Sequence, residues 1–268
     1  MKIYCNGEFK DKETLEEVFE PGFLFGWGVF ETFRAYSSKV PFLKEHIGRL
    51  NDGLNTLGIE ETKLDFKAKI EELLKENNLL DAYIRITAYK KRETTGVIIY
   101  VDKFGYYPAA AYEKGFSAII SPYKRNSHNH FAQIKSLSYL ENRMSWYEAQ
   151  KQNKDEALIL NEKEQLVGGS RSNLFIVKNQ EVITPALTSG TFYGITRKLI
   201  INELKNSRIK VKESNITVED LYSCDEAFLT SALLEAMPLV ECAGKTIGNG
   251  KLGSITRKVL EQYRSLAQ

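Results

Sequence analysis

The sequence predicts a mixed α/β fold of the α+β kind, divided into two domains. Its 268 residues are enough for one large domain or for two modest domains that share a core. Strand-like and helix-like segments occur in both halves without strict alternation, which argues against a doubly wound parallel sheet. The periodicity stops at a segment that contains Gly105 and Pro108, which is typical of an interdomain linker. We therefore expect a smaller N-terminal domain over 1–103, a linker over 104–113 and a larger C-terminal domain over 114–268.

The first domain is expected to begin and end with strands. Residues 3–9 form a predicted hairpin, because Asn6-Gly7 suits a tight turn with positive φ angles. The segment 29–36 alternates its side chains between two faces, as a strand does. Two further strands are expected over 83–89 and 97–101.

Two amphipathic helices are predicted between these strands. The first has one apolar stripe at spacings of three and four residues, and Gly58 follows it as a C-cap. The second ends before Asn77-Asn78. The stripes consist of Leu43, Ile47, Leu50, Leu54 and Leu57 in the first helix and of Phe66, Ile70, Leu73 and Leu74 in the second.

The second domain is expected to mix both kinds of element, with helices that fall between groups of strands. The expected strands are 117–120, 157–160, 174–177 and 227–229, and the expected helices are 138–151, 196–204 and 254–266.

Composition excludes several classes of function. The 37 Lys and Arg residues nearly balance the 35 Asp and Glu residues, which predicts neither nucleic-acid nor membrane binding. Cys5, Cys224 and Cys242 are too few and too far apart for a disulfide framework, and they fit a reducing compartment. The N-terminus lacks the apolar core of a signal peptide, and no apolar stretch approaches bilayer length. We therefore expect a cytoplasmic protein. His128 and His130 have no nearby Cys or paired carboxylate, so no metal site is expected.

Lys135 is the first candidate functional residue. A lysine in a partly buried, electropositive setting loses its proton near neutral pH and can then bond to a carbonyl carbon. Spacing alone favours an ordinary solvated lysine, but three segments occur in order: Gln133–Leu137, Ser172–Phe175 and Tyr193–Arg197. Together they resemble the cofactor-binding segments of the class IV aminotransferases, the fold-type IV enzymes of pyridoxal 5'-phosphate (PLP). The resemblance implies that Lys135 holds PLP as an imine, in a site between the two domains.

A phosphate site is predicted from two further segments. Gly194 precedes a helix-like run, and a helix N-terminus with close backbone approach suits a phosphate dianion. In the family that the chain resembles, the positions of Ile195 and Thr196 bind the PLP phosphate, and an arginine at the position of Arg49 reaches it as well. Arg49 lies at the flank of the apolar stripe of its helix, where it is equally consistent with a surface arginine.

The loop from Leu166 to Phe175 departs from the family pattern at one position. The family has a glutamate there that keeps the pyridine nitrogen of PLP protonated, and Gly168 stands in its place. A protonated ring is the electron sink of the cofactor. Glu162 or Glu164 replaces that carboxylate only if the hairpin register is shifted. The resemblance still implies that Ser170 and Asn173 contact the cofactor.

The substrate side is predicted from two strands and a turn. Phe30 and Thr32 share a face that in the family looks into the site, with Arg34 beside them. Tyr83 and Arg85 resemble residues of branched-chain enzymes that face a substrate carboxylate. Ser231 matches a late turn whose backbone N–H groups meet substrate or phosphate. An alternating strand with one polar face explains the same pattern without any function.

Three functions follow as hypotheses. The leading hypothesis is 4-amino-4-deoxychorismate lyase, which forms 4-aminobenzoate and pyruvate for folate synthesis, because of Thr32 and the chain length; the next two are alternatives. Arg85 favours a branched-chain or D-amino-acid aminotransferase. Gly168 favours a family member that has lost catalysis. The resemblance also implies a homodimer that acts on a small substrate bearing amino and carboxylate groups.

Overall fold

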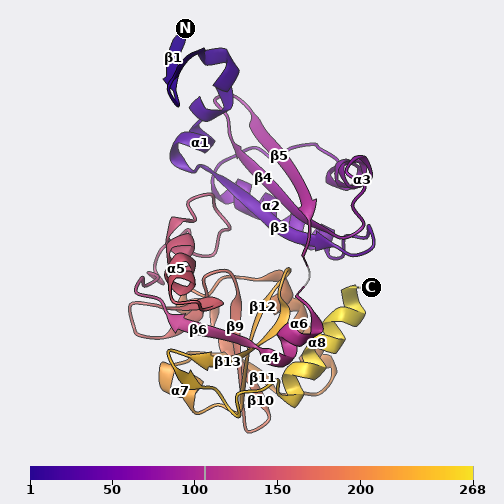
Figure 1. Cartoon of the computed structure of the whole chain (residues 1–268), viewed down its shortest axis with the longest axis vertical. Coiled ribbons are helices and arrows are strands. Elements are labelled where there is room, and N and C mark those ends of the chain that lie inside the picture. The colour runs from indigo at the N-terminus through magenta and orange to yellow at the C-terminus, as the bar shows by residue number, and fades with distance from the viewer. Residues whose placement is uncertain (106, 268) are drawn as a thin grey trace.

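The computed structural model describes residues 1–105 and 107–267. The two domains lie one above the other along the longest axis, with the N-terminal hairpin at the far end of the smaller domain (Figure 1). The mixed α/β fold with two domains is therefore confirmed, while the boundaries near 104 and 113 stay a prediction. Within these described ranges, no helix is both long and apolar enough to cross a membrane.

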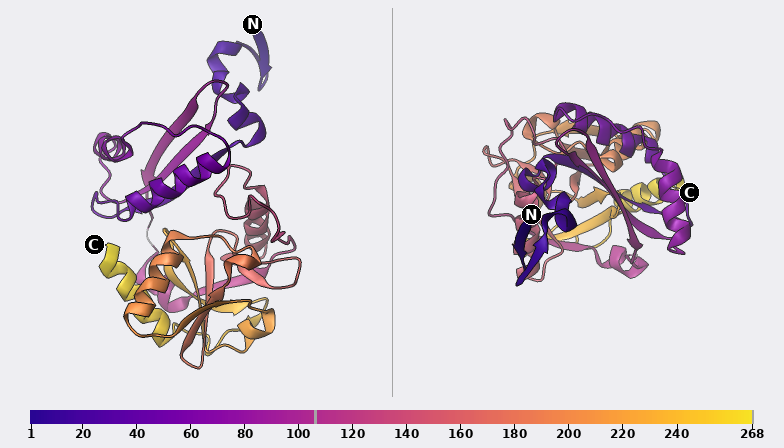
Figure 2. Two further views of the ribbon diagram at one scale, coloured as in Figure 1. Left: turned by 180° about the vertical axis from the view of Figure 1, so that it is seen from behind. Right: turned by 90° about the horizontal axis from the view of Figure 1, so that it is seen from above.

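The smaller domain is built on an antiparallel sheet of β3 (Gly28–Ala35), β4 (Ala82–Lys90) and β5 (Thr95–Lys103). Side chains of β4 are buried at nearly every second position, because successive side chains of a strand point to opposite faces. Helices α2 (Leu43–Thr56) and α3 (Phe66–Glu76) belong to the same domain, and Figure 2 shows α2 lying across the sheet. The sheet and the predicted helical stripes share one hydrophobic core.

Four short elements precede this sheet. The predicted hairpin forms, and its turn has φ of +51° at Asn6 and +92° at Gly7. The sequence did not lead us to expect the two short helices that follow it. The elements are β1 (Lys2–Cys5), β2 (Glu8–Asp11), the 3₁₀ segment η1 (Lys12–Phe19) and α1 (Pro21–Phe25).

The larger domain is built on one mixed sheet. The strand order is β11-β10-β9-β12-β13-β6-β7-β8, and β14 pairs with β13. The pairs β10–β11, β13–β6 and β6–β7 are parallel, and the other neighbouring strands are antiparallel. The strands are β6 (Phe116–Ile120), β7 (Glu156–Leu160), β8 (Leu166–Gly169), β9 (Asn173–Lys178), β10 (Glu181–Pro185), β11 (Val211–Ser214), β12 (Glu226–Ser231), β13 (Glu235–Cys242) and β14 (Lys245–Thr246).

Helices pack against both sides of this sheet. α5 packs on β7, whereas α6 and α8 pack on each other and on β12. The predicted helix 138–151 begins at Leu140. The helices are α4 (Ala109–Lys114), α5 (Leu140–Lys151), η2 (Leu187–Ser189), α6 (Ile195–Asn206), α7 (Val218–Tyr222) and α8 (Ser254–Ala267).

Part of the segment predicted as a linker is helical. α4 begins at Ala109, and its Tyr112 is 3% exposed within the core of the larger domain. An amphipathic turn that buries one aromatic ring gains enough apolar burial to dock, even in a sequence without clear periodicity. The end of this segment is therefore fixed to the larger domain.

One irregular segment joins the two domains in space. After β6 the chain returns to the smaller domain, where Ser136 forms a bridge with Val29 at the edge of β3. The Phe30 N–H donates to the Lys135 carbonyl at 2.9 Å, and the Leu137 N–H donates to the Gly28 carbonyl at 2.9 Å. Backbone pairing with β3 thus fixes the position of Lys135 in the segment that leads to α5.

Candidate active site

A pocket of about 330 Å³ lies between the two domains. The smaller domain contributes Thr32, His46 and Arg49, and the larger domain contributes the loop around Lys135, the loop after β8 and the N-terminus of α6. Several lining side chains are cationic and few are acidic, so the pocket suits an anionic ligand.

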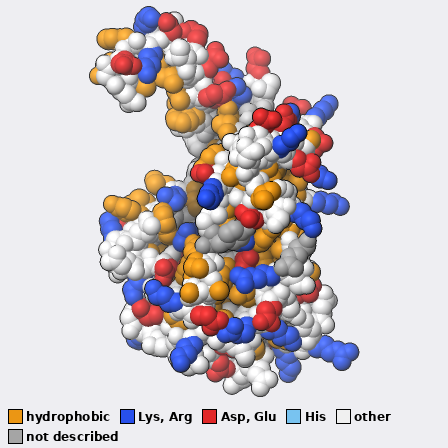
Figure 3. Space-filling view, turned by 45° about the vertical axis from the view of Figure 1, so that its right-hand side comes forward, with side chains coloured by type: hydrophobic (Ala, Val, Ile, Leu, Met, Phe, Trp, Pro, Cys, Tyr) orange, Lys and Arg blue, Asp and Glu red, His pale blue; other side chains and the backbone are white. Residues whose placement is uncertain are grey.

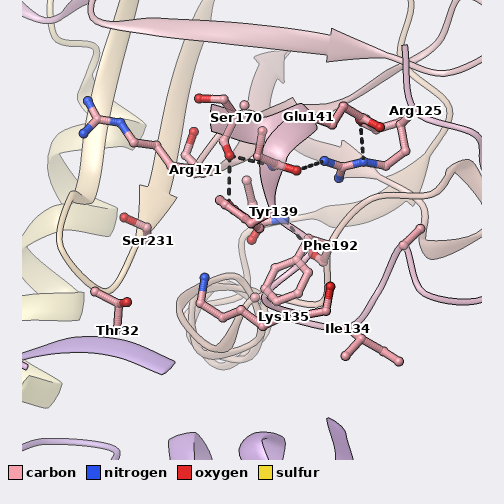
Figure 4. A pocket seen from close by; sticks show the side chains of 18 of the residues that line it. Thr32, Arg125, Ile134, Lys135, Tyr139, Glu141, Ser170, Arg171, Phe192 and Ser231 are labelled. Atoms are coloured by element: carbon pink, nitrogen blue, oxygen red, sulfur yellow. Dashed lines mark hydrogen bonds and ion pairs between the residues drawn. The ribbon is translucent and has the colours of Figure 1, made fainter. Parts of the chain in front are cut away.

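Lys135 points into this pocket, with Thr32 and Ser231 to one side and Tyr139 above it (Figure 4). Its Nζ lies 4.2 Å from the centre of the Phe30 ring and 5.4 Å from that of Tyr139. Burial, together with the charge of Arg49, lowers the pKa of Lys135 to about 7. A large fraction of this amine is therefore neutral near neutral pH, as a nucleophilic amine requires.

The end of the pocket where the phosphate is predicted, called the phosphate end below, is formed by the N-terminus of α6 and the residues around it. The first N–H groups of α6, at Ile195 and Thr196, have no acceptor within the helix and lie at the positive end of its dipole. Thr230 lines the same pocket, and its buried hydroxyl has no hydrogen-bond partner among the described residues. A phosphate group would satisfy these donors, so this end of the pocket fits PLP.

Arg49 is held by a buried carboxylate. Its Nε and Nη2 each donate to Glu31 at 2.7 Å, and its Nη1 donates to the Tyr193 carbonyl at 3.0 Å. His46 Nδ1 lies 2.7 Å from the same carboxylate. Burial alone would raise the pKa of Glu31, but the charge of Arg49 and the hydrogen bonds lower it to about 2. The fork of Arg49 therefore grips Glu31, and this pairing holds the Arg49 side chain where it lines the pocket.

The turn before α6 depends on Asn173. Its amide donates to the Phe192 carbonyl at 2.7 Å, which holds the turn that leads to Gly194. A Cβ on Gly194 would lie 2.0 Å from the Asn173 side-chain oxygen, so only glycine allows this approach. Asn173 also lines the pocket.

Gly168 offers no group to the pocket, and it is not among the lining residues. A bulge at Val167 separates the pairing of Leu166 from that of Gly168, whose φ is +136°. Glu162 instead accepts the Ser127 N–H at 2.9 Å, and Glu164 pairs with Lys124. Neither carboxylate lines the pocket, so neither replaces the absent glutamate.

A different carboxylate, Glu156, lies behind the same loop. It is fully buried, and it accepts the Ser170 N–H at 3.1 Å and the Ser172 hydroxyl at 2.8 Å. Ser170 lines the pocket, whereas Glu156, which holds the loop through these bonds, does not. The Tyr139 hydroxyl donates to the Ser170 carbonyl at 3.0 Å, which further fixes the loop.

The predicted substrate residues are only partly brought together. Thr32 lines the pocket. Phe30 does not line it, but the face of its ring contacts the Lys135 amine. The Arg85 guanidinium lies 4.0 Å from the centre of the Phe30 ring, and Tyr83 packs 5.8 Å from Tyr100, centre to centre. Neither Tyr83 nor Arg85 lines this pocket.

Comparison with known proteins identifies the family. The family model described as "Amino-transferase class IV" matches residues 28–242, which is more than half of the chain. The chain belongs to the class IV aminotransferases. It is accordingly a PLP-dependent enzyme, and the pocket geometry fits that cofactor at the lysine and at the phosphate end.

Individual relatives of this class IV aminotransferase have different substrates in their names. It is 36% identical to a putative branched-chain-amino-acid aminotransferase of Methanocaldococcus jannaschii, covering 99% of this chain and 96% of that protein. It is 31% identical to a D-alanine aminotransferase of Staphylococcus epidermidis, covering 100% and 98%.

Solved structures agree with this fold. The branched-chain aminotransferase of Escherichia coli superposes with a TM-score of 0.86 at 28% identity, covering 98% of this chain and 93% of that one. A putative 4-amino-4-deoxychorismate lyase of Legionella pneumophila has a TM-score of 0.85, covering 92% and 93%. Its identity of 23% supports the fold alone.

Sequence reasoning missed several residues of this site. Glu31 had a detectable signal, because it is a carboxylate between Val29 and Phe33 on a strand face that packs against a helix. Such a carboxylate requires a cation, and His46 and Arg49 are three residues apart on that helix. Thr230 belongs to the late turn of Ser231, but its hydroxyl had no signal in the sequence, since only the folded structure shows that this hydroxyl lacks a partner among the described residues.

Proposed function

We propose that this enzyme is an aminotransferase for small amino acids, with a branched-chain amino acid or a D-amino acid as its donor. The observation that carries the proposal is the placement of the Lys135 amine in one pocket with the α6 N-terminus and Arg49. The names of the relatives support this choice of donors. The net reaction moves an amino group from the donor to a 2-oxo acid, so the donor leaves as a 2-oxo acid.

Bound PLP supplies an electron sink that lets a bond at the substrate α-carbon break. We assign Lys135 as the residue that holds it covalently, and as the amine that moves the α-proton afterwards. Arg49 and the N–H groups of Ile195 and Thr196 bind the phosphate. The Ser231 turn completes that end of the pocket.

On the substrate side, we assign Thr32 and Phe30 to contact the substrate beside Lys135. Arg85 stacks on Phe30 and contributes positive charge near the amine, since it lowers the pKa of Lys135 along with burial and Arg49. Arg85 therefore attracts a substrate carboxylate towards the site, and Tyr83 lies on the same strand face.

The test is a panel of amino donors given to the purified, PLP-loaded enzyme. A true donor converts the visible spectrum of the bound cofactor to that of the pyridoxamine form, and Lys135→Ala abolishes the conversion. If no branched-chain or D-amino acid changes the spectrum of the loaded wild-type enzyme, the aminotransferase assignment is wrong.

A lyase is the second candidate, because Thr32 lines the pocket beside Lys135. This was the more specific expectation from the sequence, and the comparisons do not confirm it. The assay supplies aminodeoxychorismate and measures 4-aminobenzoate by chromatography. Product at no more than the level of a Lys135→Ala control removes this candidate.

The third hypothesis is that catalysis is lost because Gly168 stands where the family has a glutamate. It concerns only the part of the site that would face the pyridine nitrogen of PLP. Family membership favours an enzyme, and the complete phosphate end argues for PLP binding. A colourless purified protein that takes up no PLP when it is supplied would be the result that revives this hypothesis.

We also propose a homodimer. Hydrophobic side chains are exposed on the N-terminal region that projects from the smaller domain (Figure 3). Phe9, Phe23 and Phe25 are each more than half exposed, and such a patch on a folded enzyme marks a contact surface. Sedimentation should give twice the chain mass, and Phe25→Ser should shift the distribution towards monomer. A monomer at all concentrations refutes the dimer.

A further inference from the structure

A second buried carboxylate, Glu235, connects the two domains. It is 2% exposed and lies at the start of β13. Its Oε2 accepts hydrogen bonds from Arg264 Nε at 2.7 Å and from the Tyr112 hydroxyl at 3.0 Å, both in the larger domain. Its Oε1 accepts the Tyr36 hydroxyl at 3.2 Å and lies 3.5 Å from Arg34 Nη1, both in the smaller domain. Oε2 thus pairs with the larger domain, and Oε1 pairs with the smaller domain.

The two smaller-domain residues of this cluster also pack on each other. The Arg34 guanidinium stacks 3.8 Å from the centre of the Tyr36 ring, and Arg34 is 5% exposed. A carboxylate out of water is costly unless several donors compensate its charge, so loss of any donor shifts the whole arrangement. Arg34 was expected on the face that looks into the site, but it pairs with Glu235 and does not line the pocket.

Glu235 is adjacent to the pocket through the hairpin of β12 and β13. It is paired directly with Ser231, and only residues 232–234 separate them. Thr230, Ser231 and Ala232 all line the pocket. Glu235 also has φ of +56°, a conformation that is unfavourable for a non-glycine residue and persists only where surrounding contacts impose it.

We propose that Glu235 is a positioning residue, which fixes the smaller domain and the Thr230–Ala232 turn relative to each other and so shapes the phosphate end of the pocket. The proposal rests on the PLP site described above. Glu235 does not line that site, and it acts through its contacts with Tyr36, Arg34 and Ser231.

Two matched variants test this proposal in the full-length chain. Tyr36→Phe removes one hydroxyl from the smaller-domain side of the carboxylate, and Tyr112→Phe removes one from the larger-domain side. Glu113→Gln is a further control, since it breaks an exposed ion pair between α4 and α8 whose two residues do not line the pocket. For each protein we would measure the PLP dissociation constant after reloading, the melting temperature, and the rate of proteolytic cleavage between the domains.

We expect Tyr36→Phe to weaken PLP binding by roughly three- to tenfold and to speed interdomain cleavage, because a hydrogen bond to a charged group is lost at the junction. Tyr112→Phe should lower the melting temperature about as much as Tyr36→Phe does. It should leave the PLP dissociation constant within about twofold of the wild-type value, since Arg264 still holds the same carboxylate oxygen. Glu113→Gln should change none of the three.

Equal effects of Tyr36→Phe and Tyr112→Phe on PLP affinity would overturn the proposal, as would no effect of either. Both results would mean that the cluster stabilises the fold without positioning the site. Wild-type protein that binds no PLP would instead refute the proposed function, so the two failures can be told apart.

Discussion

Gly168 is the position where the sequence and the folded backbone make opposite predictions. From the sequence alone, Gly168→Glu restores the missing carboxylate and should raise turnover. In the structure, φ at Gly168 is +136°, and a Cβ built there would lie 2.9 Å from the Ser172 carbonyl oxygen. That oxygen belongs to the backbone and cannot rotate away. Any side chain at this position should therefore destabilise the loop.

The cost has two parts. A non-glycine residue forced into such a conformation costs roughly 1–3 kcal/mol. Overpacking against a fixed neighbour costs roughly another 1–3 kcal/mol. Gly168→Ala should thus lower the free energy of unfolding by at least about 2 kcal/mol. In a chain of this size each kcal/mol shifts the melting temperature by about 2–4 °C, so the expected loss is at least about 4 °C.

Thermal unfolding of the PLP-free protein measures this loss. Gly48→Ala is the matched control, because Gly48 lies in α2 with nothing within 4 Å of its would-be Cβ. In a helix that change should raise stability by about 0.5–1 kcal/mol. Gly168→Glu should lose at least as much stability as Gly168→Ala, without gaining turnover. A Gly168→Ala protein that melts with the wild type would refute the reasoning.

Three further predictions concern the pocket. The rate at which the PLP-free protein takes up PLP covalently should rise with pH around a midpoint near 7, because only the neutral Lys135 amine reacts; a midpoint near the ordinary lysine value of about 10.4 would contradict the burial argument. Thr230→Val should weaken PLP binding and raise the stability of the PLP-free protein by about 1 kcal/mol, because it removes a buried hydroxyl that has no partner in the described part of the chain. A PLP affinity unchanged in that variant would show that the hydroxyl does not face the phosphate. Arg49→Met should lower the free energy of unfolding by about 3–5 kcal/mol, because it leaves the Glu31 charge buried. The double variant Arg49→Met, Glu31→Gln should recover part of that loss in denaturant titrations, and a purely additive result would exclude the pairing.

Local elements could be predicted because their causes are local. The apolar spacing of Leu50 and Leu54 specifies a helix face, and Asn6-Gly7 specifies a turn, whatever the rest of the chain does. Strands such as β8 could not be predicted, because a short run with two glycines becomes a strand only when β7 pairs with it.

The site divides in the same way. The order of Lys135, Asn173 and Thr196 along the chain predicted that all three belong to one pocket, and the structure brings them together. The sequence could not show that Tyr83 and Arg85 lie outside the lined volume. Distances between side chains of separate elements depend on how those elements pack.

The sequence by itself indicated the family, since the segments around Lys135, Asn173 and Thr196 occur in the order that resembles the class IV aminotransferases. Only the tertiary structure decided that Arg49 pairs with the buried Glu31, why Gly168 must stay a glycine, and that Glu235 links the domains. Each of these depends on burial and on contacts between segments far apart in the chain. Desolvation and Coulombic pairing change the energy of a charge by several kcal/mol, and that change exists only once the chain has folded.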